Sequence, residues 1–290
     1  MEGGSGNNNN QNYDELKEYN NSIIDEILEQ DYSKRFYESE MREIAEYCAK
    51  NGIELLNTTL DPDHYYHSDS GIPAVAFIDP DTGKEIWVHG NYIQDYQVNS
   101  FNKGLVEGID EIRKSLTQMP EGYTDKLNTV SLCTENDRYL GYFWGYYPNN
   151  IHLSSRLFSS NTQKTGVIGT VVHELTHLNE YQNYGYSGAN RIFSNNPDLF
   201  PENKPTRYGT VDPTENITTL VEQVYTHTLR NDAQMKDGTL VNEAFYTKYK
   251  RYPQTQEDRD MMYEMWEDEW YPAIVETKDW INGGFKGKNN

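Results

Sequence analysis

Residues 171–179, Val-Val-His-Glu-Leu-Thr-His-Leu-Asn, hold two histidines four positions apart with a glutamate between them. The surrounding periodicity predicts a helix over about 165–181. Its apolar stripe consists of Ile168, Val171, Val172 and Leu175. Because positions i and i+4 share one face of a helix, His173 and His177 are expected to project side by side. Two imidazoles in this arrangement can bind one zinc ion.

Glu174 has a different role from the histidines on either side of it. It lies one step round the helix from His173, too far offset to bind the same ion. From there its carboxylate can reach a metal-activated water, so Glu174 is the expected general base. The alternative is a pair of solvated helix histidines, which requires the motif to arise by chance in a chain with only 7 histidines.

A zinc site that performs chemistry needs a third protein ligand, with the fourth position left to water. Residues 207–216 read Arg-Tyr-Gly-Thr-Val-Asp-Pro-Thr-Glu-Asn and open a second predicted helix over 213–230. Asp212 takes its N-cap position and Glu215 its third position. We expect Glu215 to be the third ligand. Alternatively, Asp212 and Glu215 form only a capping box, which explains both residues without a metal.

Glu222 lies two turns beyond Glu215 on nearly the same side of this helix. The apolar stripe on the other side consists of Ile217, Leu220, Val221 and Val224. Glu222 is therefore a candidate to orient a metal-binding histidine by accepting its second ring proton. Alternatively, Glu222 is equally well explained as a charged residue on the protein surface.

These residues resemble zincin metallopeptidases whose third ligand is glutamate, and among them most closely the anthrax lethal factor catalytic domain family. The resemblance covers 165–182 and 207–224, two segments within a span of about a fifth of the chain. In that family a Tyr-Gly pair precedes the ligand glutamate by the spacing found between Tyr208 and Glu215. The resemblance implies that Tyr208 is the phenol that stabilises the oxyanion.

One residue departs from the pattern of this family, and one short motif resembles a competing family. Its members carry an acidic residue one turn beyond the ligand glutamate, where this chain has Thr219. The partner that orients a histidine must then come from elsewhere, with Glu222 as the candidate. Residues 209–212, Gly-Thr-Val-Asp, also resemble peptidases whose third ligand is aspartate, which makes Asp212 the competing ligand. That pattern then fails, because Glu215-Asn216 stands where it requires Tyr-Gly.

Zincins generally bind substrate as a strand added to the edge of a sheet. Residues 150–154, Asn-Ile-His-Leu-Ser, precede the first metal helix and are similar in position to that edge strand. On this strand, His152 either faces the substrate or is exposed to water. The irregular segment 183–206 is longer than ordinary connections and could form part of the substrate cleft.

Strands precede helices in the second part of the chain, which favours an α+β fold. We expect a flexible tether at 1–12, a small α+β unit at 13–98, and a zincin-like catalytic domain with a mixed sheet at 99–290. The unit contains two helices and a β-hairpin whose turn is Asp-Pro-Asp-Thr-Gly, 79–83. The domain is expected to have a helix at 98–116, strands at 129–133, 140–147 and 150–154, and a late helix at 256–270.

The composition excludes some classes of partner. A net charge of −21 repels phosphate backbones, so nucleic acid is not an expected partner. No stretch reaches the roughly 18 apolar residues of a membrane helix. Cys48 and Cys133 are expected to be buried free thiols, with one disulfide as the alternative. The Gly-, Ser- and Asn-rich start, without an export signal of its own, weakly favours an exported protein over a cytoplasmic one.

Together these observations predict a zinc-dependent endopeptidase whose substrate is a protein or peptide and whose cofactor is Zn²⁺. One alternative is a zincin-like binding or cell-surface protein in which the metal is structural and no catalysis occurs. Another keeps catalysis but confines it to one dedicated protein substrate.

Overall fold

The fold is α+β, as predicted, in the computed structural model of the chain. The described residues are 7–30, 37–57, 74–119, 122–134, 139–159, 166–185, 214–215, 218–219, 221–222, 248–251 and 254–265. The chain divides into two compact units. The first comprises residues 1–118, 127–142 and 149–162, and the second comprises 119–126, 143–148 and 163–290.

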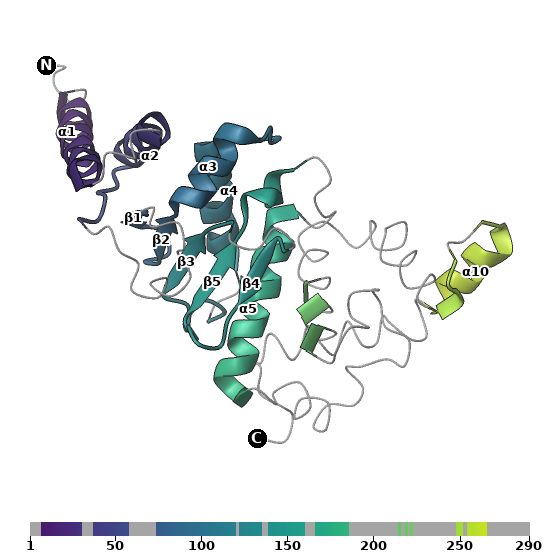
Figure 1. The fold of residues 1–290 in the computed structure, drawn as a ribbon. Helices are drawn as coiled ribbons and strands as arrows, with labels where there is room; N and C mark the ends of the chain where they lie inside the picture. The colour runs from purple at the N-terminus through teal and green to yellow at the C-terminus, as the bar shows by residue number, and fades with distance from the viewer. Residues whose placement is uncertain are drawn as a thin grey trace, which may run out of the picture. The chain divides into compact units, whose positions relative to one another are not determined.

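A five-stranded mixed sheet, in the order β1-β2-β3-β5-β4, organises the first unit (Figure 1). Its strands are β1 (Val75–Ile78), β2 (Glu85–Val88), β3 (Thr129–Leu132), β4 (Gly141–Phe143) and β5 (Asn150–Leu153). β1 pairs antiparallel with β2, whereas β2, β3 and β5 are parallel neighbours. The β4–β5 connection, 144–149, is too short for a parallel crossover, so β4 runs antiparallel.

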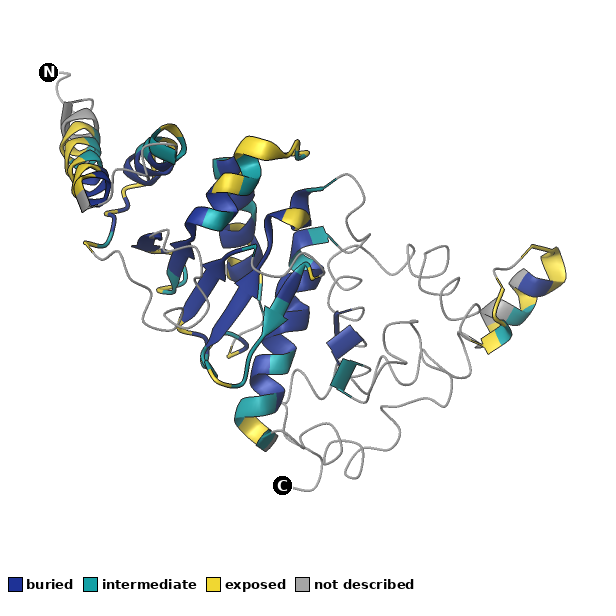
Figure 2. Cartoon of the chain, viewed as in Figure 1, coloured by how far each residue is buried: buried dark blue, intermediate teal, exposed yellow. Residues whose placement is uncertain are grey.

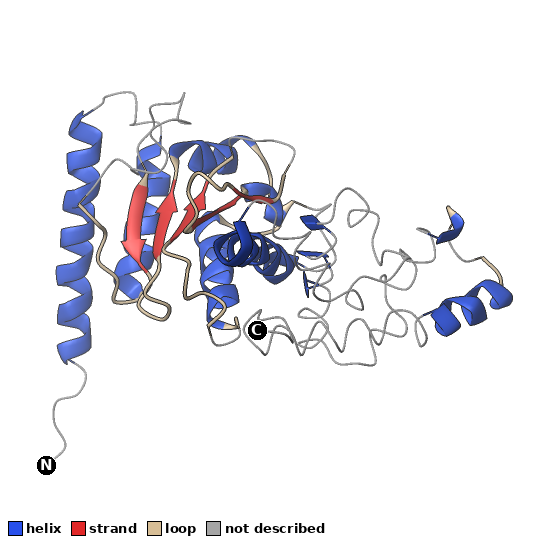
Figure 3. Cartoon of the chain, turned by 90° about the horizontal axis from the view of Figure 1, so that it is seen from below, coloured by secondary structure: helices blue, strands red, loops and turns tan. Residues whose placement is uncertain are grey.

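The middle of this sheet is buried on both faces. Every residue of β3 and β5 is buried, as expected for parallel strands covered by helices (Figure 2). The helices of the first unit are α1 (Asn7–Gln30), α2 (Glu38–Lys50), α3 (Gly90–Val98), α4 (Leu105–Thr117) and the short 3-10 helix η2 (Ser155–Phe158). α1 and α2 pack against each other, and α1 lies beyond the β1 edge of the sheet (Figure 3).

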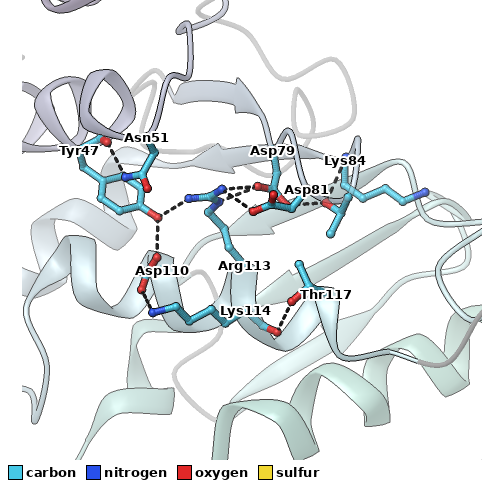
Figure 4. A network of polar contacts seen from close by, with 10 residues as sticks. Tyr47, Asn51, Asp79, Asp81, Lys84, Asp110, Arg113, Lys114 and Thr117 are labelled. Atoms are coloured by element: carbon cyan, nitrogen blue, oxygen red, sulfur yellow. Dashed lines mark hydrogen bonds and ion pairs between the residues drawn. The ribbon is translucent and has the colours of Figure 1, made fainter. Parts of the chain in front are cut away.

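A buried polar network centred on Arg113 ties three elements of the first unit together (Figure 4). Its guanidinium donates to Asp79 Oδ1 at 2.7 Å and lies 3.3 Å from Asp81 Oδ2, both in the β1–β2 turn. It also donates to the Tyr47 hydroxyl of α2 at 2.7 Å, which in turn donates to Asp110 at 3.1 Å. Burial raises the pKa of Tyr47 to about 12, so the hydroxyl keeps its proton.

The second unit contains α5 (Gly166–Tyr184) and α10 (Gln256–Met265). α10 begins with a reciprocal cap, because Thr255 Oγ1 accepts from the Asp258 amide and Asp258 accepts from the Thr255 amide, each at 3.1 Å. Among the described residues, no helix is both long enough and apolar enough to cross a membrane.

Several boundaries differ from those predicted. α1 begins at Asn7, so the second half of the expected tether at 1–12 is helical. The helix predicted at 98–116 starts later, because Val98 is the last residue of α3 and α4 begins only after Gly104. Glu107 accepts a hydrogen bond from the Gly104 amide at 3.0 Å and so caps α4. The periodicity of apolar residues alone does not show that residues 99–104 lie outside a helix.

The expected boundary at residue 98 does not coincide with an edge of either compact unit. The reason is the parallel pairing of β2 with β3, which joins strands from both sides of residue 98 into one sheet. The cysteines follow the prediction, since Cys48 and Cys133 are both buried free thiols. The disulfide alternative is therefore wrong.

Candidate metal centre

The helix α5 carries both histidines of the motif, as the sequence predicts. Its apolar side is fully buried through Val171, Val172, Leu175 and Leu178. His173 and Glu174 are also buried, at 8% and 4% exposure. These polar side chains therefore lie in the interior of the second unit, where polar groups are stable only if they meet a partner or a ligand.

The polar side of α5 is held by other parts of the second unit. Thr176 makes a short hydrogen bond with the Tyr123 hydroxyl, and Asn179 donates to the Tyr123 carbonyl at 2.9 Å. One turn further on, Gln182 donates to the Pro148 carbonyl at 2.7 Å. Because Thr176 and Asn179 flank His177, these bonds restrict rotation of the helix and fix where the histidines point. No pattern in the sequence indicated Tyr123.

Three ligand atoms converge beside α5, and they belong to His173, His177 and Glu215. The two Nε2 atoms are 3.1 Å apart, and Glu215 Oε2 lies 3.1 Å from the first and 3.6 Å from the second. Ligands about 2.0–2.2 Å from a tetrahedral zinc ion lie about 3.3–3.6 Å from one another. Two of the separations are about 0.2 Å shorter than this range and the third lies at its upper end, so the three atoms are close enough together to bind one ion.

Glu215 comes from a second stretch of helical backbone, described at 214–215, 218–219 and 221–222. The Thr218 hydroxyl lies 3.4 Å from the Glu215 carboxylate, and the Thr219 hydroxyl donates to the Glu215 backbone carbonyl at 2.6 Å. Glu222, two turns beyond Glu215, places its Oε2 3.2 Å from Nδ1 of His173. Both ring nitrogens of His173 therefore face a carboxylate.

The charges in this cluster shift one another strongly. Burial by itself lowers the pKa of His173, but hydrogen bonds to Glu215 and Glu222 outweigh it and raise the pKa to about 10. Burial also opposes ionisation of Glu215, yet hydrogen bonds from His173 and His177 hold its pKa well below the usual range. The cluster therefore favours a positive charge between its ligand atoms, which either a proton or a metal ion can supply.

Glu174 stands apart from these pairs. Its Oε2 is buried and has no hydrogen-bond partner among the described residues. Burial raises its pKa to about 8, although the positive charge on His173 partly offsets this shift. Once ionised, Glu174 can take a proton at this unpartnered oxygen from a bound water or substrate.

The structure brings together most, but not all, of the predicted site residues. His173, His177 and Glu215 meet at one point, with Glu174 next to them in the chain. A capping box is therefore not the whole role of Glu215, because its carboxylate contacts both histidines. Tyr208 and the competing ligand Asp212 lie outside the described residues, as does 186–206 of the long segment.

The substrate strand and His152 need correction. β5 is an interior strand between β3 and β4, so the edge strand on that side of the sheet is β4. Neither role predicted for His152 holds. It is 1% exposed, stacks on the Tyr142 ring at 4.2 Å, and places Nδ1 3.7 Å from the Cys133 sulfur. Strand order decides which strand is at the edge, and local sequence does not encode it.

Comparison of the chain with protein-family models, curated proteins and solved structures found no match.

Proposed function

We propose that the protein is a zinc-dependent endopeptidase of the zincin class. The observation that carries the proposal is the convergence of two Nε2 atoms and one carboxylate oxygen at 3.1–3.6 Å. Two histidines and a glutamate are a ligand set of catalytic zinc sites, which leave one position open. The orphaned Oε2 of Glu174 adds the base that such a site requires.

In this proposal each side chain has one task. His173, His177 and Glu215 hold the ion, which when bound acts as a Lewis acid toward water and the peptide carbonyl. Glu174 accepts the proton of the attacking water and returns it to the leaving amine. Tyr208 donates a hydrogen bond to the oxyanion, a role that the family resemblance alone implies.

The proposed substrate is an extended segment of a protein or peptide. A substrate that adds to the edge of a sheet pairs its backbone with an unpaired strand. The edge strand on that side of the sheet is β4 (Gly141–Phe143) and not β5. Export of the protein stays a prediction from its Gly-, Ser- and Asn-rich start.

The second candidate function is a zincin-like binding protein with a structural metal. A structural zinc site generally uses four protein ligands, whereas the described residues supply three here. A purely structural site also has no use for Glu174, because burying a carboxyl oxygen without a hydrogen bond costs stability. Both observations favour catalysis.

Elemental analysis of the purified chain tests the ligand set, with folding matched by circular dichroism. We expect about one zinc per wild-type chain. Glu215→Ala should lose the metal, and Asp212→Ala should keep it. The zinc-bearing protein is then incubated with a peptide library to detect cleavage. Absence of zinc from the wild-type protein, even after incubation with the metal, would refute the proposed function.

A further inference from the structure

The carboxylate of Glu222 contacts the ring nitrogen of His173 that does not face the metal position. Its Oε2 lies 3.2 Å from Nδ1, while Nε2 of the same ring faces Glu215 and His177. Glu222 is only 5% exposed, so water competes weakly for this contact. A hydrogen bond from Nδ1–H to the carboxylate leaves the Nε2 lone pair for the ion.

Glu222 takes this place because the nearer residue is engaged elsewhere. Thr219 is one turn beyond Glu215, and its hydroxyl donates to the Glu215 carbonyl at 2.6 Å. Its donor is therefore used within its own helical turn. Seven residues of helix span about 10 Å, so Glu222 reaches the far side of the imidazole while Glu215 reaches the near side.

We infer that Glu222 is a positioning residue that fixes the ring orientation and tautomer of His173 and thereby sets the zinc affinity. The inference rests on the proposed zinc site. Removing such a partner typically weakens metal binding by about 10–100-fold. Glu222 contacts His173, and His173 would bind the ion. The last residue of the described helical stretch therefore acts on the site through His173.

Two substitutions separate the position of the carboxylate from its charge. Glu222→Asp keeps the charge but shortens the side chain by one methylene, so its oxygens no longer reach Nδ1. Glu222→Gln keeps the reach and an acceptor oxygen but loses the charge. Both retain a polar group, which limits the risk of misfolding. Val221→Ala is the matched control, because Val221 is fully buried in the same stretch, so its truncation destabilises the fold, and its apolar side chain cannot hydrogen-bond to His173.

Zinc dissociation constants are measured on the full chain by competition with a chromophoric chelator, and cobalt-substituted protein provides a visible spectrum that reports ligand geometry. We expect Glu222→Asp to bind zinc about 10–100-fold more weakly, with an altered cobalt spectrum. Glu222→Gln should stay within about tenfold of the wild type, since a neutral acceptor forms a hydrogen bond of roughly half the strength. Val221→Ala should keep the wild-type affinity.

The inference is overturned if Glu222→Asp binds zinc as the wild type does, if Glu222→Gln is the weaker variant, or if Val221→Ala loses as much affinity. Failure of the proposed function looks different. A wild-type chain that binds no zinc refutes the metal site itself, whereas a zinc-binding, peptide-cleaving chain that is indifferent to Glu222 refutes only the positioning role.

Discussion

Two buried clusters of charged side chains, one in each compact unit, differ in how their atoms are satisfied. In the first unit, Arg113 is a cation that donates to Asp79 and to the Tyr47 hydroxyl (Figure 4). In the second unit, His173, His177 and Glu215 direct ligand atoms toward one point. The first cluster contains its own cation, whereas the second needs one from outside.

This difference separates a structural network from a candidate site. Buried charges stabilise a fold only when opposite charges and hydrogen bonds compensate their lost hydration. The Arg113 network meets that condition with residues of the chain alone. The histidine cluster meets it only with an added proton or metal ion, and it leaves Glu174 Oε2 without a partner among the described residues. Substitutions in the two clusters should therefore affect different properties.

The largest expected effect is on catalysis, from Glu174→Gln. An amide cannot accept the proton, so kcat/KM for a cleaved peptide should fall by about 10²–10⁴-fold. The zinc content should stay at the wild-type value, because Glu174 is not a ligand. Thermal unfolding should show no loss of stability, since the uncharged amide is easier to bury. Wild-type activity in this variant would remove Glu174 from the mechanism.

Arg113→Met should have the largest effect on stability. It leaves Asp79, at 0% exposure, buried without its cation, which typically costs about 3–5 kcal/mol. Urea unfolding of the purified variant measures this cost. Adding Asp79→Asn should recover part of it, because the amide carries no charge. Zinc content should not change, and a variant that loses zinc while folded would contradict the separation of the two clusters.

Removing the metal is the next test. A ligand that binds only the folded state at about 100 times its dissociation constant adds about 2.7 kcal/mol of stability. Chelation should therefore lower the melting temperature of the wild type, and adding zinc should restore it. His177→Ala, which lacks one ligand, should melt alike with and without zinc. Equal melting of the wild-type protein in both conditions would argue against a metal in the second cluster.

Tyr47→Phe should have the smallest effect. It removes the hydroxyl that accepts from Arg113 and donates to Asp110, at a cost of about 1–2 kcal/mol. The cost should be below that of Arg113→Met, because Arg113 keeps Asp79. Urea unfolding under the same conditions compares the two variants. Equal costs would show that Tyr47, and not the ion pair, holds this network together.

Local patterns predicted much of the fold. Periodicity located α2, α5 and the strands β1, β2, β3 and β5 to within a few residues, and the turn at 79–83 joins β1 to β2 as expected. The errors concern long-range pairing. The boundary at 98 and the edge position of residues 150–154 both depended on which strands lie side by side. Strand order is set by crossovers and by burial of whole faces, which no local window contains.

The candidate site likewise combines features that local sequence predicted with features that depend on the tertiary structure. Helical geometry alone places His173 and His177 on one face and offsets Glu174 from them. The choice of Glu215 rested on a resemblance and on a helix start, with a capping role as a competing explanation. The distances from Glu215 to the two histidines show that its carboxylate does more than cap. For Tyr208 and Asp212, outside the described residues, the roles stay predictions.

The sequence by itself determined the helix α5, the shared face of its two histidines and the separate position of Glu174, because neighbours within two turns are related by helix geometry. Only the tertiary structure decided that Glu222 contacts His173 and that His152 is buried, since these contacts join residues 49 and 19 positions away along the chain. Such contacts depend on how whole elements pack, because burial is decided by the assembled core and not by the residues next to each site.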